Sequence, residues 1–151
     1  MKFPSLEWFQ ALQHLSNQDL ERFKRLGFCD CTVGIKVEPD DGSERAEGFV
    51  LTFDGYTCTD IRETARPEEE ADFTLAGFYS VWQEMIENIR QHGEPDLDHT
   101  LNYLAMPGIA LRVIARDQLK EDLFYRYNQT LQQFFNEAAK VETEFVALVG
   151  R

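Results

Sequence analysis

The sequence lacks the features of a secreted or membrane-spanning protein. Its three cysteines, Cys29, Cys31 and Cys58, are an odd number, which argues against the paired disulfides of a small secreted domain. The N-terminal residues MKFPSLEWFQ contain no apolar run of the kind found in signal peptides. No stretch approaches the roughly 18 consecutive apolar residues of a transmembrane helix. We therefore expect a cytoplasmic protein that does not span a membrane.

Basic residues are also scarce. The 151 residues include 15 Lys and Arg against 27 Asp and Glu, which gives a formal net charge of -12. Proteins that bind nucleic acid neutralise phosphates with clustered Lys and Arg, and docking on anionic lipid has the same requirement. We therefore expect no nucleic-acid partner, and we interpret the negative charge as a contribution to solubility.

Motifs of common enzymes and metal sites are missing as well. The sequence has no G-x-S-x-G elbow, no dinucleotide-binding G-x-G-x-x-G and no phosphate-binding G-x-x-x-x-G-K. Cys29-Asp30-Cys31 offers two thiolates, whereas a structural zinc site needs four ligands. Asp96, Asp98 and His99 lie in a polar stretch that lacks the twelve-residue calcium pattern. We predict no catalytic residue, no metal site and no cofactor.

Hydrophobic periodicity in the first half of the chain predicts two helices followed by three strands. Apolar residues at helical spacing indicate a first helix capped by Ser5 and a short second helix that ends at Gly27. Alternating residues then indicate strands at 32–38, 48–55 and 57–64, joined by turn-forming residues. Three consecutive strands of this kind favour antiparallel pairing.

The second half of the chain predicts a strand, a helix, a second strand and a final helix. Phe73 and Leu75 point inward from a strand that breaks at Gly77, before a helix. An apolar strand at 108–117, covered on both faces, precedes a helix whose apolar spacing continues to Leu148. The chain is therefore predicted to be a single α+β domain of residues 1–151. It would contain a five-stranded, mainly antiparallel sheet covered on one face by helices, with an extended C-terminal helix.

The apolar residues of the two longest helices admit two interpretations. They are Phe78, Trp82, Met85 and Ile86 in the first helix, and Phe124, Tyr127, Leu131, Phe134 and Phe135 in the second. An apolar stripe at helical spacing usually packs into a core. The same side chains would line a binding cavity if the sheet and helices did not close completely. Periodicity does not distinguish core from cavity.

The order of elements and several residues resemble the sterol-carrier-protein (type two) family of lipid-binding domains. The resemblance covers most of the chain. It rests on the Trp-bearing helix and short helix of SLEWFQALQHLSNQDLERFKRLG, the strand Ala71-Asp72-Phe73-Thr74-Leu75, the glycine and tryptophan at Gly77 and Trp82, and the glycine-led strand from Gly108 to Val113. The connection at 91–107 and the final helix are longer here than is usual in that family.

This resemblance implies a sheet and helices that enclose an apolar tunnel, with the two long helices supplying its walls. It implies binding of a sterol, a fatty acid or another acyl chain, without catalysis. One alternative is an interaction module, in which Val141, Phe145 and Leu148 of the extended helix dock on a partner or on a second copy of the chain. A small enzyme resembling nuclear transport factor two is less favoured, because such folds normally finish on strands.

Overall fold

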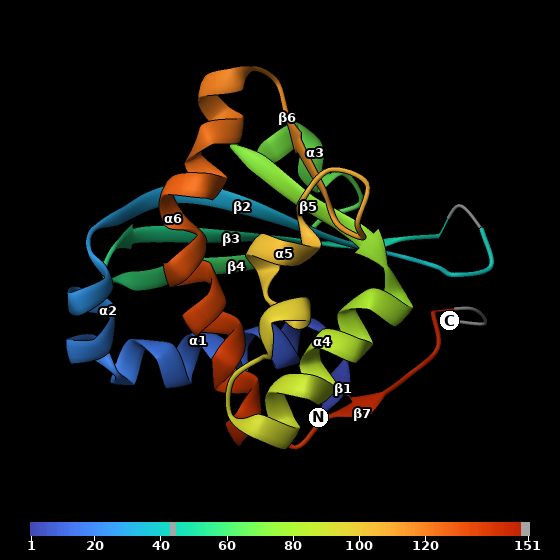
Figure 1. Ribbon diagram of the computed structural model, residues 1–151, viewed down its shortest axis with the longest axis horizontal. Helices are drawn as coiled ribbons and strands as arrows, with labels where there is room; N and C mark the ends of the chain where they lie inside the picture. The colour runs from blue at the N-terminus through green and yellow to red at the C-terminus, as the bar shows by residue number, and fades with distance from the viewer. Residues whose placement is uncertain (43–44, 149–151) are drawn as a thin grey trace.

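A five-stranded sheet forms the centre of the protein, which we describe for residues 1–42 and 45–148 in a computed structural model (Figure 1). Its strands are β2 (Cys29–Glu38), β3 (Glu47–Gly55), β4 (Thr57–Glu63), β5 (Phe73–Phe78) and β6 (Arg112–Ala115), in the spatial order β4-β3-β2-β5-β6. Three of the four pairings are antiparallel, and β2 pairs with β5 in parallel. The sheet is therefore mixed, and the predicted α+β class with a five-stranded, mainly antiparallel sheet is confirmed.

Most of the helices lie together on one face of this sheet (Figure 1). The helices are α1 (Leu6–Gln18), α2 (Leu20–Leu26), α3 (Pro67–Glu70), α4 (Tyr79–His92), α5 (Leu101–Leu104) and α6 (Gln118–Asn136), with 3-10 turns η1 (Leu97–His99) and η2 (Glu137–Lys140). The exception is the single turn α3, which packs on the opposite face. The inner face of the sheet, with Ile35, Phe49 and Leu75, is thereby removed from water.

Local signals in the sequence set the ends of several helices. The Ser5 hydroxyl accepts a hydrogen bond from the backbone N–H of Trp8 at 3.1 Å, as predicted for the first helix. Asp117 caps α6 in the same way, because its Oδ1 accepts from the N–H of Lys120 at 2.9 Å. Gly93 ends α4 in the left-handed region, with φ of +84°, where glycine has no Cβ to clash.

The C-terminal segment corrects the expectation of an extended final helix. α6 ends at Asn136, and the chain then forms η2 and a short strand, β7 (Glu144–Phe145), which pairs in parallel with β1 (Lys2–Phe3). The Phe145 ring contacts that of Phe3 edge-on at 5.9 Å. The apolar spacing continues beyond α6 because Val141 and Leu148 are buried against the rest of the chain, a pattern that helical periodicity does not distinguish from a helix. Because α6 ends at Asn136, the structure gives no basis for a docking surface on an extended helix or for the homodimer expected through it.

The last strand of the sheet also differs from its prediction. The run at 108–117 was expected to form a strand covered on both faces, but β6 spans four residues at the edge of the sheet. Within the described ranges its one strand partner is β5, and its side chains are half-buried or exposed. The preceding Leu111 is buried, which explains part of the apolar character of the run.

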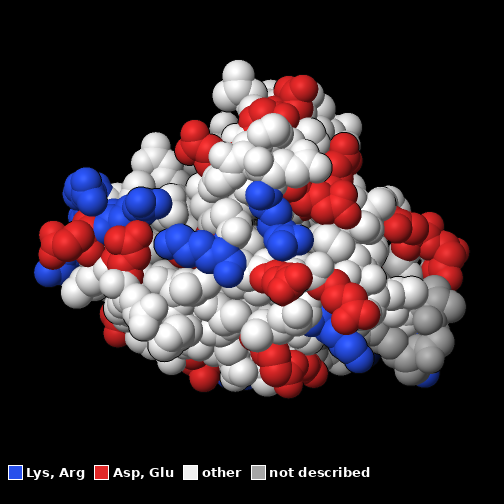
Figure 2. Space-filling view, turned by 90° about the horizontal axis from the view of Figure 1, so that it is seen from below, with Lys and Arg blue, Asp and Glu red and all other residues white. Residues whose placement is uncertain are grey.

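Charged side chains of both signs share the molecular surface that is seen from below in Figure 2. On that face Lys and Arg lie among Asp and Glu, and the basic side chains do not form an extended patch of their own. In the part of the chain that the structure describes, no helix is long and apolar enough to cross a membrane.

Candidate functional site

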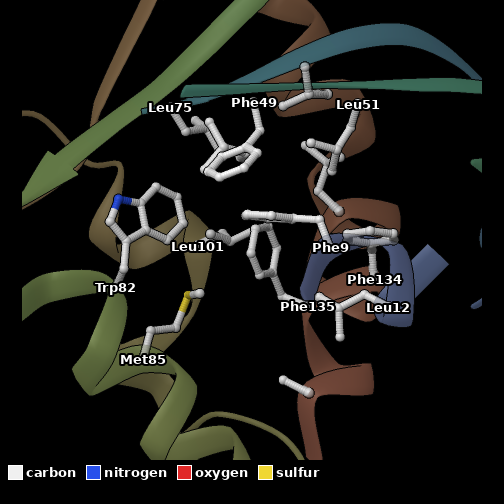
Figure 3. Packing of buried hydrophobic residues seen from close by; sticks show 14 of the residues in the cluster. Phe9, Leu12, Phe49, Leu51, Leu75, Trp82, Met85, Leu101, Phe134 and Phe135 are labelled. Atoms are coloured by element: carbon white, nitrogen blue, oxygen red, sulfur yellow. The ribbon is translucent and has the colours of Figure 1, made fainter. Parts of the chain in front are cut away.

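Aromatic rings fill the space between the inner face of the sheet and the helices (Figure 3). Trp82 of α4 stacks on Phe135 of α6, with ring centroids 5.7 Å apart and an angle of 27° between the planes. Phe9 of α1 packs on Phe49 of β3 at 4.6 Å. Phe134 of α6 packs edge-on against Phe53 of β3, with ring centroids 5.5 Å apart. These rings are fully buried and connect three helices to the sheet.

The structure brings most of the predicted ligand-binding residues into this interior. Each of six side chains is at most 1% exposed: Trp82, Met85 and Ile86 from α4, and Phe124, Leu131 and Phe134 from α6. Tyr127 is half-buried and packs against the same cluster. They form one continuous apolar cluster with Phe135 of α6 and with Phe9 and Phe49, two residues that the prediction did not include.

Phe78 lies outside this cluster. α4 begins one residue later than expected, at Tyr79, so Phe78 keeps the extended backbone of β5. Side chains alternate along a strand, and Phe73 and Leu75 already point inward, so Phe78 points to the opposite face. Its side chain is 51% exposed. The prediction extended the helical period across a strand–helix junction, which shifted this residue to the wrong face.

Trp82 is held in place by a polar contact as well as by packing. Its indole N–H donates a hydrogen bond to the backbone carbonyl of Lys36 in β2, at 3.2 Å. Gly77 leaves room beside it, because a Cβ there would lie 2.4 Å from Leu111 and 3.6 Å from the indole nitrogen. The glycine and tryptophan singled out in the sequence therefore act together in packing α4 against the sheet.

The short helix α5 closes the interior between α4 and α6. Leu101 is fully buried and points toward Phe9, Trp82 and Phe135 (Figure 3). Its backbone N–H donates to Oε1 of Gln132 in α6 at 2.7 Å. The side-chain amide of Gln132 therefore attaches the start of α5 to α6, because two helices do not share a backbone ladder as strands do. Sequence analysis did not predict that Leu101 enters the core.

Comparisons with known proteins were made by sequence and by structure. No family model matches the chain, and no curated protein matches it. One similar solved structure is that of sterol carrier protein 2, with a TM-score of 0.66 and 21% identity over 91% of this chain and 98% of that chain. The chain has the sterol carrier protein 2 fold. A second similar structure belongs to a conserved hypothetical protein of Thermus thermophilus, considered a candidate sterol carrier protein (TM-score 0.68, 21% identity, 93% and 90% of the two chains).

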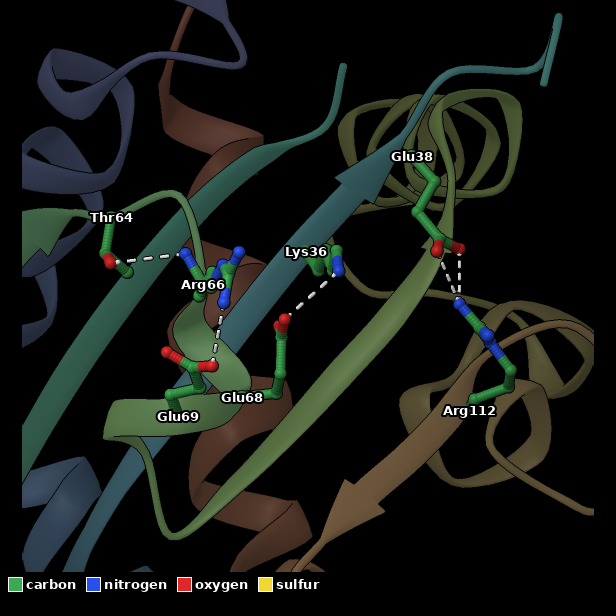
Figure 4. Close-up of polar contacts among 7 residues, drawn as sticks. All are labelled: Lys36, Glu38, Thr64, Arg66, Glu68, Glu69 and Arg112. Carbon is green, nitrogen blue, oxygen red and sulfur yellow. Dashed lines mark hydrogen bonds and ion pairs between the residues drawn. The ribbon is translucent and has the colours of Figure 1, made fainter. Parts of the chain in front are cut away.

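In this sterol carrier protein 2 fold the outer face of the sheet is polar, unlike the inner face (Figure 4). Lys36 Nζ lies 3.3 Å from Oε1 of Glu68 in α3, and Arg112 of β6 pairs with Glu38 of β2 at 2.6 Å. Gly48 lets α3 approach closely, because a Cβ there would lie 2.7 Å from Cδ of Pro67. The candidate surface for an apolar ligand is therefore the inner one.

Three thiols lie on the inner face of the sheet at the end away from Trp82. Cys29 and Cys31 Sγ atoms are 3.8 Å apart, and both residues are buried, as is Cys58. Burial raises the pKa of Cys58 to about 12. The pKa of Cys31 is also raised, chiefly by its hydrogen bond with Cys29 and by burial. Both thiols therefore stay protonated at neutral pH. Among the described residues no group of three or more His, Cys, Asp or Glu side chains is placed to hold a metal ion.

A polar cluster attaches η1, which precedes α5, to α4. His99 Nδ1 lies 2.6 Å from Oδ1 of Asp96, and its Nε2 lies 3.2 Å from Oε1 of Glu84 in α4. Asn88 of α4 donates to Asp96 at 3.0 Å and accepts from the Asp96 backbone N–H at 2.8 Å. The hydrogen bond to Asp96 is the main reason that the pKa of His99 is raised, and Glu84 adds to it. When the imidazole is protonated, it donates to both carboxylates and so links η1 to α4.

The His99 link is expected to make stability depend on pH. Because the folded pKa is raised, this contribution is complete below the unfolded histidine value of about 6.5 and is lost as pH rises through the folded pKa. Between pH 6 and pH 9, the melting temperature of the natural protein is expected to fall by about 1–3 °C more than that of His99→Asn. Differential scanning fluorimetry measures this difference, and His92→Asn, at an exposed position, is the control. Identical pH profiles for the natural protein and His99→Asn would contradict the assignment.

Proposed function

We propose that the protein binds a lipid or another apolar ligand, such as a sterol, a fatty acid or an acyl chain, without catalysing a reaction. The observation that carries this proposal is the continuous apolar interior of a sterol carrier protein 2 fold, lined by α4 and α6 and closed by α5. The name of the similar protein describes it as a carrier of sterols. Support from this chain itself comes from the six buried side chains predicted as ligand contacts.

Ligand binding in this interior requires side chains to move. The main surface hollows among the described residues are not lined by the predicted ligand-binding residues. An apolar ligand would therefore replace Leu101 and its neighbours in contact with Trp82, Met85 and Phe135. Burial of the ligand contributes about 25 cal/mol per Å2 of apolar area, which offsets the cost of displacing α5. α5 is suited to such movement because it is one helical turn, attached to α6 through Gln132.

The chemistry of the interior supports binding without catalysis. General acid–base and nucleophilic catalysis need groups that titrate near the working pH. The rings that contact Phe135 are those of Trp8, Phe9, Trp82 and Phe134, none of which titrates near neutral pH, and the thiols of Cys31 and Cys58 have raised pKa values. A bound ligand would be held by contact area and shape, and it would be released unchanged.

Native mass spectrometry of the purified protein, followed by organic extraction, tests the proposal. We expect a mass offset that disappears on denaturation and a lipid in the extract. Protein stripped of lipid should then take up a fluorescent fatty acid, and unlabelled ligand should displace it. A clean mass together with no uptake of the fluorescent fatty acid would overturn the proposal and leave the aromatic cluster as an ordinary core.

A further inference from the structure

A surface groove of about 360 Å3 lies next to Leu101, between α6 and the η1–α5 segment. We call it the amide groove, because six of the side chains that line it are carboxamides: Asn102, Asn128, Gln129, Gln132, Gln133 and Asn136. Thr100, Leu26 and Leu97 complete the lining. All of these residues are uncharged, in a protein with 28% charged residues. The composition of the groove therefore differs from that of the surface around it.

Carboxamides recognise a particular kind of ligand group. Each one presents N–H donors and a carbonyl acceptor but carries no charge, so it can donate to a hydroxyl oxygen and accept from a hydroxyl proton. A charged carboxylate or ammonium would lose hydration in such a site without gaining an opposite charge. The side chains of Asn102 and Gln129 make no hydrogen bond within the described residues and are exposed to the groove side. They are available to a ligand without breaking an existing contact.

The groove is also connected to the apolar interior. Gln132 takes part in the groove lining and accepts the hydrogen bond from the Leu101 backbone. The Leu101 side chain extends from that point into the cluster around Trp82 and Phe135. On α6, the groove residues Gln132 and Gln133 directly precede the buried Phe134 and Phe135. A ligand that separated α5 from α6 would thus have one end among amides and the other among aromatic rings.

We propose that the amide groove binds the uncharged, hydroxyl-bearing headgroup of the ligand, while the apolar part passes beneath α5 into the interior. This inference rests on the proposed function and makes it more specific. It selects lipids with a glycerol, sugar or other neutral polyol headgroup over free fatty acids with the same chain. Gln129 contributes hydrogen bonds to the headgroup, and Gln132 opens the path when it releases Leu101.

Monolauroylglycerol and laurate provide the test, since they share one acyl chain and differ in headgroup charge. Isothermal titration below micelle-forming concentrations is expected to show monolauroylglycerol binding about tenfold more tightly, a difference that two neutral hydrogen bonds would supply. Gln129→Lys places an ammonium in the groove and is expected to reverse this preference. The matched control is Gln118→Lys, which adds the same charge to the exposed first turn of α6, where Gln118 contacts Asp122. The control is expected to keep the natural preference.

The outcomes separate this inference from the proposed function. Equal affinities for the two lipids, with Gln129→Lys behaving like Gln118→Lys, would overturn the headgroup assignment and leave apolar-ligand binding intact. No binding of either lipid, together with a lipid-free extract, would overturn both. Competition by glycerol or galactose without an acyl chain would support the same hydroxyl recognition and assign its source to a soluble polyol.

Discussion

Replacing Trp82 with alanine is expected to lower the free energy of unfolding by about 3–5 kcal/mol. The indole ring is fully buried, stacks on Phe135 and donates to the Lys36 carbonyl. Its removal leaves a cavity between α4 and α6 and deletes the hydrogen bond to the Lys36 carbonyl. Urea denaturation followed by far-UV circular dichroism measures the change, as a lower midpoint at an unchanged slope.

Phe78→Ala is the matched control for Trp82→Ala. Phe78 is also aromatic and lies four positions earlier, but its side chain is half exposed. We expect its replacement to change the free energy of unfolding by no more than about 0.5 kcal/mol. A loss below about 1 kcal/mol for Trp82→Ala, or equal losses for the two variants, would contradict the packing described for α4.

Leu101→Ala is expected to have two effects of opposite sign. It should lower the free energy of unfolding by about 2–5 kcal/mol, because a fully buried side chain is removed from the centre of the interior. It should also raise the affinity for a fluorescent fatty acid about tenfold, since the ligand no longer has to displace that side chain. Chemical denaturation and a fluorescence binding titration on one preparation measure the two effects together.

Met106→Ala controls for changes elsewhere in the same segment. Met106 lies two residues after the end of α5, outside the lining of the amide groove, and its side chain is 49% exposed. We expect its replacement to leave stability and fatty-acid affinity nearly unchanged. If Leu101→Ala destabilised the protein while binding stayed at the natural level, the ligand would reach the interior by a route other than the one beneath α5.

The effects of Leu101→Ala on stability and on affinity together indicate how an interior that side chains fill could still bind a ligand. A ligand that binds only the folded protein stabilises it by mass action. Saturating fatty acid should therefore recover part of the stability that Leu101→Ala loses, because the acyl chain occupies the vacated space. In this view α5 fills the site when no ligand is bound and prevents exposure of the aromatic cluster to water.

Local pattern in the sequence was sufficient for much of the fold. Two-residue alternation predicted β2, β3 and β5, and the spacing of Trp82, Met85 and Ile86 predicted the buried face of α4. These predictions succeeded because each element buries one face, and the spacing of apolar residues within the element shows which face that is. The prediction failed for Phe78, which lies where the strand period of two changes to the helix period of 3.6. At such a junction, an error of one residue in the helix start moves a side chain from the inward to the outward face.

The sequence by itself therefore determined the strands, the main helices, their buried faces and the resemblance to a sterol-carrier fold. Only the tertiary structure placed Leu101 in the core, joined His99 to Glu84 and gathered the carboxamides of α5 and α6 into one groove. It also turned the end of the chain into β7, paired with β1. Each of these features depends on contacts between residues far apart in the chain. Such contacts depend on how the elements pack together, and they cannot be predicted from the local periodicity of one segment.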